Sequence, residues 1–203
     1  MNQLVTEFTG KNLDNFETPN EYLVKAKATV QKYADDLAQN IKSGNGLLIA
    51  GIVNTGKTHL AHAIEECCYG LKKDSGESYK TCFVDYLDLI IECKRAISNK
   101  ETDEWKVLEH YGWKDILIID DFMVDTKTGE WVSELTYWLI NNRYNFKKAT
   151  IITTNHTLAE LEEMFGFYGK RIVSRLQRMN AQKPIWIGQR RSRKETTDET
   201  DTD

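Results

Sequence analysis

The stretch that decides the fold reads GIVNTGKT and spans residues 51–58. It fits the pattern G-x-x-x-x-G-K-[ST]. In this pattern the glycines let backbone N–H groups point at phosphate, the lysine reaches the β- and γ-phosphates, and the hydroxyl binds Mg²⁺. The stretch therefore predicts a P-loop that holds a nucleoside triphosphate together with magnesium.

The residues on either side of the loop agree with this prediction. Leu47-Leu48-Ile49-Ala50 predicts a short buried strand that runs into the loop, and a helical pattern of apolar residues begins at Leu60. Asn54 stands where many P-loops have glycine, and asparagine tolerates a left-handed backbone well, so the loop is expected to keep its shape. The expected nucleotide-binding residues are Gly51, Asn54, Thr55, Gly56, Lys57, Thr58 and His59.

His59 and His62 follow the P-loop lysine at helical spacing, which raises the question of a metal site. No third ligand is evident, so surface or packing roles on the helix are the ordinary interpretation of the pair.

Two acids directly follow a run of branched apolar residues at 116–119. A P-loop needs one carboxylate at the end of a neighbouring strand for Mg²⁺ and another to orient the attacking water. We expect Asp120 to serve the metal, with Thr58, and Asp121 to serve the water. The alternative is a solvated turn after the strand.

Asn155 ends the next predicted strand segment, Ile151-Ile152-Thr153-Thr154-Asn155, where the loops of a parallel sheet face the ligand. It is a candidate to polarise the γ-phosphate or the attacking water. The alternative is a place in the N-cap region of a helix, because His156, Thr157 and a helical pattern follow.

Three arginines share one face of a predicted helix at 168–180: Arg171, Arg175 and Arg178. Such a face is usually solvated. As the alternative, one guanidinium reaches the γ-phosphate held by an adjacent subunit and acts as an arginine finger.

Strand and helix patterns alternate along the 203 residues. The pattern predicts an α/β domain in which a mainly parallel five-stranded sheet lies between helices. The expected strands are 47–50, 81–84, 115–120, 149–154 and 184–187; the expected helices include one amphipathic helix over 22–41 and others over 87–98, 129–146 and 168–180.

Composition excludes few functions. The formal charge is −4, and five acids lie in the last nine residues, so the charge neither demands nor forbids a nucleic-acid partner.

The four cysteines lack C-x-x-C spacing and are expected to be free thiols. No signal peptide or membrane-spanning run is evident, which predicts a cytoplasmic protein without membrane contact.

Several motifs occur in a specific order: GIVNTGKTHLA, DILIIDDF, NNRY, TIITTN and RIVSRLQRM. Their combination resembles the bacterial and phage helicase-loader ATPases of the DnaC and DnaI type and their transposition-helper relative IstB. The resemblance covers roughly residues 16–191. It implies an AAA+ fold with ATP bound between neighbouring protomers, and the loading of a replicative helicase onto single-stranded DNA.

The resemblance also implies roles for individual residues. Lys57 and Thr58 look like the Walker A lysine and magnesium ligand, Asp120 and Asp121 like the Walker B pair, and Asn155 like the first sensor. Arg175 looks like the arginine finger, with Arg171 as runner-up. Residues 12–16 look like the segment ahead of the ATPase core, and Arg190 or Arg191 like the second sensor.

We therefore expect an ATPase that assembles with itself and acts in DNA replication as a helicase loader. The expected organisation is a linker and helix over 1–44, an AAA+ domain over 45–191 and a disordered acidic tail over 192–203. An IstB-like transposition helper, a small-molecule kinase and a nucleotide sensor that does not hydrolyse remain alternatives. The second Walker B acid is aspartate where some loaders have glutamate. No stretch of the sequence is expected to correspond to the N-terminal helicase-binding domain of the longer loaders, so two alternatives stay open: a fragment of a longer protein, or a short loader of phage type that binds its helicase in another way.

Overall fold

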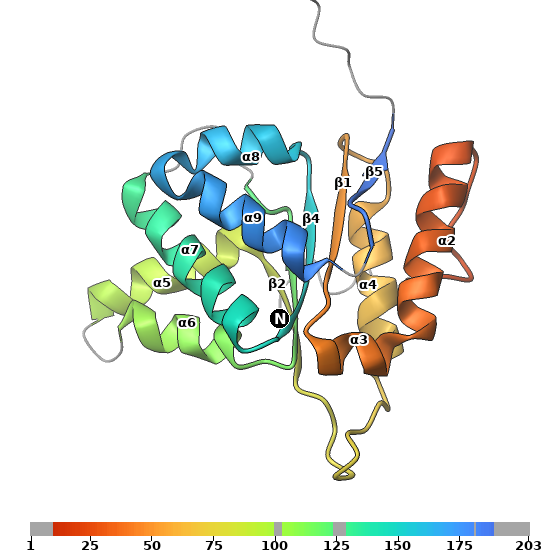
Figure 1. The fold of residues 1–203 in the computed structure, drawn as a ribbon, viewed down its shortest axis with the longest axis horizontal. Coiled ribbons are helices and arrows are strands. Elements are labelled where there is room, and N and C mark those ends of the chain that lie inside the picture. The colour runs from red at the N-terminus through yellow and green to blue at the C-terminus, as the bar shows by residue number, and fades with distance from the viewer. Residues whose placement is uncertain (1–9, 100–102, 124–128, 181, 189–203) are drawn as a thin grey trace, which may run out of the picture.

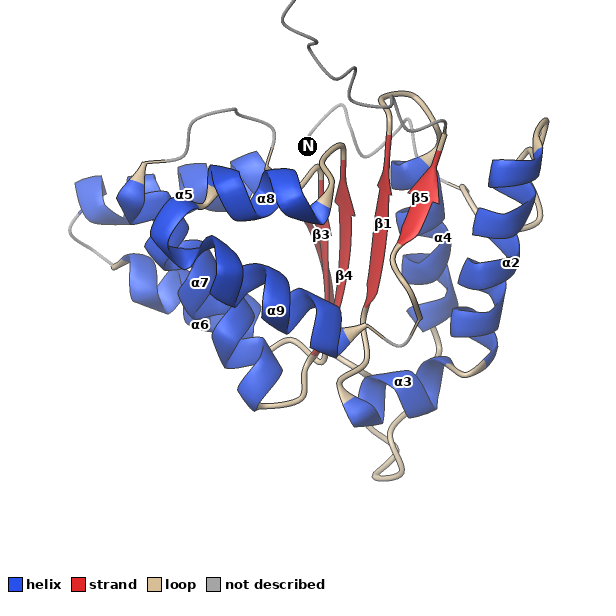
Figure 2. Ribbon diagram, turned by 45° about the horizontal axis from the view of Figure 1, so that its top comes forward, coloured by secondary structure: helices blue, strands red, loops and turns tan. Residues whose placement is uncertain are grey.

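The computed structural model describes residues 10–99, 103–123, 129–180 and 182–188. Its centre is a five-stranded sheet in the order β2-β3-β4-β1-β5, in which every pairing is parallel (Figures 1 and 2). The predicted α/β class and five-stranded parallel sheet are thus confirmed. The strands are β1 (Leu47–Gly51), β2 (Thr81–Asp85), β3 (Ile116–Asp120), β4 (Ala149–Thr154) and β5 (Ile185–Ile187).

Helices cover both faces of the sheet (Figure 1). Successive residues of a strand point to opposite faces, so Ile49 packs into one core with α2, α3 and α4, and Leu48 into a second core with α5 to α9. The described helices are α2 (Glu21–Asp35), α3 (Leu37–Ser43), α4 (Lys57–Cys68), α5 (Tyr86–Asn99), α6 (Glu104–Gly112), α7 (Glu130–Asn145), α8 (Leu158–Met164) and α9 (Gly169–Met179).

The expected single helix over 22–41 is wrong, because the chain breaks at Asp36 and forms α2 and α3. The break frees the carbonyl of Tyr33, and the side chain of Asn40 donates a hydrogen bond to it at 3.0 Å. Both helices place their apolar residues in the same core, so the spacing of apolar residues continues across the break.

Helix α6 was not predicted. Its N-cap is Asp103, whose side chain accepts a hydrogen bond from the backbone amide of Lys106. Fully buried Arg143 of α7 holds the far end of α6 in place by donating to the carbonyls of Tyr111 and Gly112 at 2.9 and 3.2 Å. This arginine of the NNRY motif therefore has a structural role.

The parallel strands bring their carboxyl ends to one edge of the sheet, where the loops after β1, β3 and β4 lie together (Figure 2). Helices α2 and α3 share a core with β1 and α4, and the division at residue 44 stays a prediction. The proposed tail over 192–203 lies outside the described residues. No helix in the described ranges combines the length and apolar character needed to cross a bilayer.

Candidate ATP-binding and catalytic site

The predicted P-loop connects the end of β1 to the start of α4. Asn54 and Gly56 have φ angles of 61° and 83°, in the left-handed region. A side chain at Gly56 would also collide with the ring of Phe16, because a Cβ there would lie 2.7 Å from its Cε2. The second glycine of the motif is thus required by both backbone conformation and space.

Lys57 begins α4 and is only 5% exposed. Its ammonium donates to the carbonyl of Ile52 at 2.8 Å, across the P-loop. Burial lowers the pKa of Lys57, while the nearby carboxylates of Asp121 and Asp120 act in the opposite direction. A largely buried cation is thus held over the loop whose backbone is suited to phosphate.

Thr58 and Asp120 meet although 62 residues separate them in the chain. The hydroxyl of Thr58 donates to Asp120 Oδ2 at 2.8 Å, and Asp120 is 6% exposed at the end of β3. A hydroxyl and a carboxylate side by side are ligands that suit Mg²⁺. Among the described residues no group of three or more His, Cys, Asp and Glu could hold a metal, so this pair would share the ion with phosphate oxygens and water.

Asp121 has a left-handed backbone with φ of 47°. Burial raises the pKa of Asp121, the charge of Asp120 raises it further, and Lys57 lowers it. A non-glycine residue in this conformation is strained by roughly 1–3 kcal/mol, and such residues cluster at functional sites. A carboxylate with a raised pKa beside the proposed metal ligand suits a group that accepts a proton from water.

Thr153 forms hydrogen bonds with both Asp120 and Asp121, and the sequence alone did not predict this role. Its hydroxyl donates a hydrogen bond to Asp120 Oδ1. The same hydroxyl accepts a hydrogen bond of 2.9 Å from the backbone amide of Asp121. Thr153 is fully buried in β4, the strand beside β3. A single hydroxyl therefore fixes the carboxylate of one acid and the backbone of the other.

Asn155 follows the end of β4. Its Oδ1 is buried and has no hydrogen-bond partner among the described residues. Helix α8 is capped by Thr157 in a capping box with Glu160, so Asn155 is not the N-cap. A buried acceptor without a partner requires an explanation, and a role toward a bound group supplies one.

Arg171 and Arg175 of α9 lie against α7. Arg175 is half-buried, donates from Nε to Asn141 Oδ1 at 2.6 Å, and lies 5.1 Å from the ring centroid of Tyr137. Arg171 is exposed and lies 5.3 Å from the ring of Phe167. These contacts are with α7, α9 and the turn before α9, and none of them is with the P-loop. Arg190 and Arg191 lie outside the described residues.

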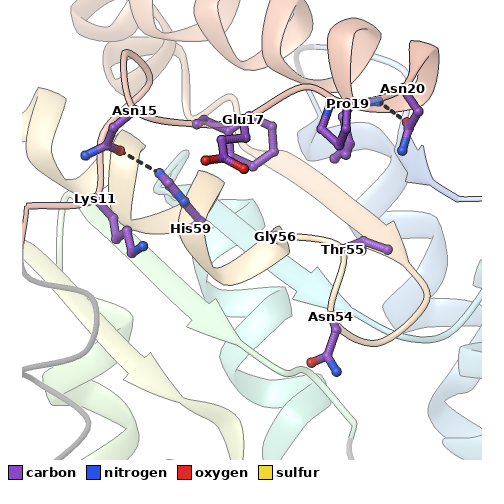
Figure 3. Close-up of a pocket in the computed structure, with 11 residues that line it drawn as sticks. Lys11, Asn15, Glu17, Pro19, Asn20, Asn54, Thr55, Gly56 and His59 are labelled. Atoms are coloured by element: carbon purple, nitrogen blue, oxygen red, sulfur yellow. Dashed lines mark hydrogen bonds between the residues drawn. The ribbon is translucent and has the colours of Figure 1, made fainter.

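A cavity of about 560 Å³ adjoins the P-loop (Figure 3). The segment before α2 contributes Asn15 and Asn20 to its wall, and the loop contributes Asn54 and Thr55. This volume is in the range of small-molecule and cofactor sites. The sequence indicated the loop side of this cavity but not the wall opposite it.

His59 lies at the end of the cavity that also holds Lys11 and Asn15 (Figure 3). Its Nε2 is 2.9 Å from the carbonyl of Asn12 and 3.0 Å from Asn15 Oδ1, and its ring meets Phe16 edge-on. Burial lowers the pKa of His59, while its hydrogen bond to the backbone carbonyl of Asn12 acts in the opposite direction. His59 thus ties the start of α4 to the cavity wall.

Comparison with known proteins shows the family of this chain. The profile of the family described as "Bacterial DnaA ATPAse domain" matches residues 13–180. The replicative helicase loader DnaC of Escherichia coli K12 is 26% identical over 176 residues, covering 87% of this chain and 65% of that protein. The chromosomal replication initiator DnaA of Neisseria gonorrhoeae is 30% identical over 139 residues, covering 68% of this chain and 25% of that protein. The chain therefore spans less than two thirds of these relatives.

Solved structures agree with the sequence comparisons. A crystal structure of the DnaC helicase loader has a TM-score of 0.75 at 28% identity and covers 90% of this chain and 99% of that one. The crystal structure of DnaI has a TM-score of 0.71 at 20% identity and covers 90% of this chain and 94% of that one. The structure of AMPPCP-bound DnaA from Aquifex aeolicus has a TM-score of 0.62 at 22% identity and covers 82% of this chain and 47% of that one. The latter two show the fold alone. The predicted resemblance to helicase-loader ATPases is confirmed.

Proposed function

The chain belongs to the family of the bacterial DnaA ATPase domain, and from this premise we propose that it is an ATPase that loads a hexameric replicative helicase onto single-stranded DNA. The observation that carries the ATPase part is the meeting of Thr58 and Asp120 beside Lys57. The loader part is supported by similarity to DnaC over most of the chain.

In this proposal the P-loop residues bind the phosphates of ATP. Lys57 supplies the cation and Gly56 the close backbone approach, while Thr58 and Asp120 hold Mg²⁺. When bound, Mg²⁺ offsets negative charge on the phosphates. The cavity lined by Asn15 and Asn20 would receive the rest of the nucleotide.

Hydrolysis is assigned to the residues that follow β3 and β4. Asp121 orients the attacking water and accepts its proton, and Asn155 interacts with the γ-phosphate or the same water. Thr153 keeps the backbone of Asp121 in place through its hydroxyl. These roles are supported by the left-handed Asp121 and the unpartnered oxygen of Asn155.

We further propose that the protein acts in the cytoplasm as an ATP-dependent homo-oligomer, with the helicase and single-stranded DNA as its partners. Residues 45–191 would form the AAA+ domain, and 1–44 would supply its leading linker and helices.

The loading role is tested with the replicative helicase encoded by the same genome and a circular single-stranded DNA. We expect the chain and ATP together to raise the amount of helicase recovered on the DNA several-fold, and Lys57→Ala to abolish this gain. The readout is gel filtration of the complexes. Equal recovery without the chain would refute the loading role and leave the ATPase assignment standing.

Arg175→Ala is expected to leave ATP binding by a monomer intact but to lower hydrolysis by about 10³-fold, because an arginine finger acts on the nucleotide of the neighbouring protomer. Mixing it with Lys57→Ala should restore part of the ATPase activity. The first variant keeps its P-loop and the second keeps its Arg175, so mixed interfaces contain one complete site.

The matched control is Arg178→Ala, which removes an exposed arginine of the same helix and should hydrolyse ATP normally. Co-purification of untagged Arg175→Ala with affinity-tagged Lys57→Ala shows whether mixed oligomers form. If mixed oligomers form without activity, or if Arg175→Ala is fully active, Arg175 only packs against α7.

A further inference from the structure

The end of the molecule opposite the P-loop carries an excess of lysine. Three segments meet at the edge where the strands begin: the loop 72–80 before β2, residues 114–115 before β3 and residues 146–148 before β4 (Figure 1). Together with Lys42 of α3 they contain seven lysines and three acids, in a chain whose net charge is −4. We call this set the basic edge.

The basic edge contains a cavity of about 570 Å³, as large as the one beside the P-loop. Asp115 joins two of the segments, since its carboxylate pairs with Lys73 at 2.7 Å and Lys148 at 3.1 Å. Asp74 pairs with Lys42 at 2.8 Å. These ion pairs hold the cavity walls in position.

The other lysines of the basic edge have no acidic partner in the described part of the chain: Lys72, Lys80, Lys114 and Lys147. Lys72, Lys80 and Lys147 are exposed. Lys147 also has a left-handed backbone, with φ of 49°. The basic edge therefore presents cations whose charge is not neutralised within the protein, which suits a polyanion.

Exposed aromatic rings lie beside these cations. Trp113 and Phe146 are 49% and 53% exposed, and their ring centroids are 4.8 Å apart. Phe146 lines the cavity with Tyr79. Lysines would attract any polyanion, but exposed rings add a platform on which bases stack, so the combination favours nucleic acid over an acidic peptide.

We propose that the basic edge binds single-stranded nucleic acid, with Lys72 and Lys147 contacting phosphates and Trp113 and Phe146 stacking on bases. This inference deepens the proposed function, on which it rests for the identity of the strand as DNA. Because the basic edge and the P-loop lie at opposite ends of the strands, a strand bound here does not compete with ATP.

The test uses fluorescence anisotropy of a labelled oligo(dT) with the full chain. Replacing both Lys72 and Lys147 by Gln should weaken binding at least 10-fold and reduce the slope of log K against log salt by about 1.4, as expected for two lost phosphate contacts on a single strand. Phe146→Ala should weaken binding roughly 5- to 100-fold without changing that slope. The control Lys25→Gln replaces an exposed lysine of α2 and should bind normally.

The outcomes separate this inference from the proposed function. If wild type binds the oligonucleotide and the variants bind equally well, the basic edge is not the site, while the loader proposal stands. If Phe146→Ala has no effect and duplex DNA binds as tightly as the single strand, the stacking assignment is wrong. If wild type binds no single-stranded DNA with or without ATP, this inference and the DNA part of the proposed function both fail.

Discussion

Lys57→Ala is expected to weaken Mg·ATP binding by at least about 10²-fold, because a charge-assisted hydrogen bond to each of two phosphates is lost. Lys57 is the buried cation that lies across the P-loop from Ile52. Its pKa is lowered by burial, so its charge is costly in the folded protein. The variant is therefore expected to fold, and calorimetric titration of nucleotide measures the loss.

Lys94→Ala is the matched control, because Lys94 is an exposed lysine of α5. It should bind nucleotide like wild type. Thermal unfolding of both variants establishes that each is folded. Unchanged ATP affinity in folded Lys57→Ala protein would remove the P-loop assignment.

Asp121→Asn is expected to keep ATP binding and slow turnover by about 10²-fold or more. The amide cannot accept the proton of the attacking water. Asparagine tolerates the left-handed backbone of position 121, and the hydrogen bond from its backbone amide to Thr153 does not involve the side chain. The turn should thus survive while the chemistry is lost. Single-turnover phosphate release, with nucleotide affinity measured in parallel, separates the two effects.

The pH profile supplies an independent readout. Because burial raises the pKa of Asp121, wild-type turnover should fall on acidification at a higher pH than an ordinary aspartate would give. Asp121→Asn should lack this acidic limb. Turnover at the wild-type rate would show that another group serves the water.

The strands were predictable because parallel strands covered on both faces are continuous apolar runs, as at 47–50 and 116–119. The break at Asp36 was not, since α2 and α3 contribute to one core and their apolar spacing is continuous. Helix α6 was missed because it is short and much of its surface is exposed.

As with the fold, some residues of the site could be predicted from the sequence and others could not. Thr58 and Asp120 follow from motifs, and their hydrogen bond agrees with the predicted pairing, although their roles stay predictions. Thr153 becomes visible only when β4 is known to lie beside β3, and the alternation of strands and helices along the sequence does not specify strand order. The cavity wall before α2 depends on tertiary packing of a segment without periodicity.

ATP hydrolysis that responds to DNA is the central activity proposed for this protein. The direct measurement is phosphate release by the full chain with Mg·ATP, with and without single-stranded DNA, beside Asp121→Asn as the slow reference. We predict steady release by wild type, a changed rate when single-stranded DNA is added, and release about 10²-fold or more slower by Asp121→Asn. Wild-type release no greater than that of Asp121→Asn under both conditions would contradict the account.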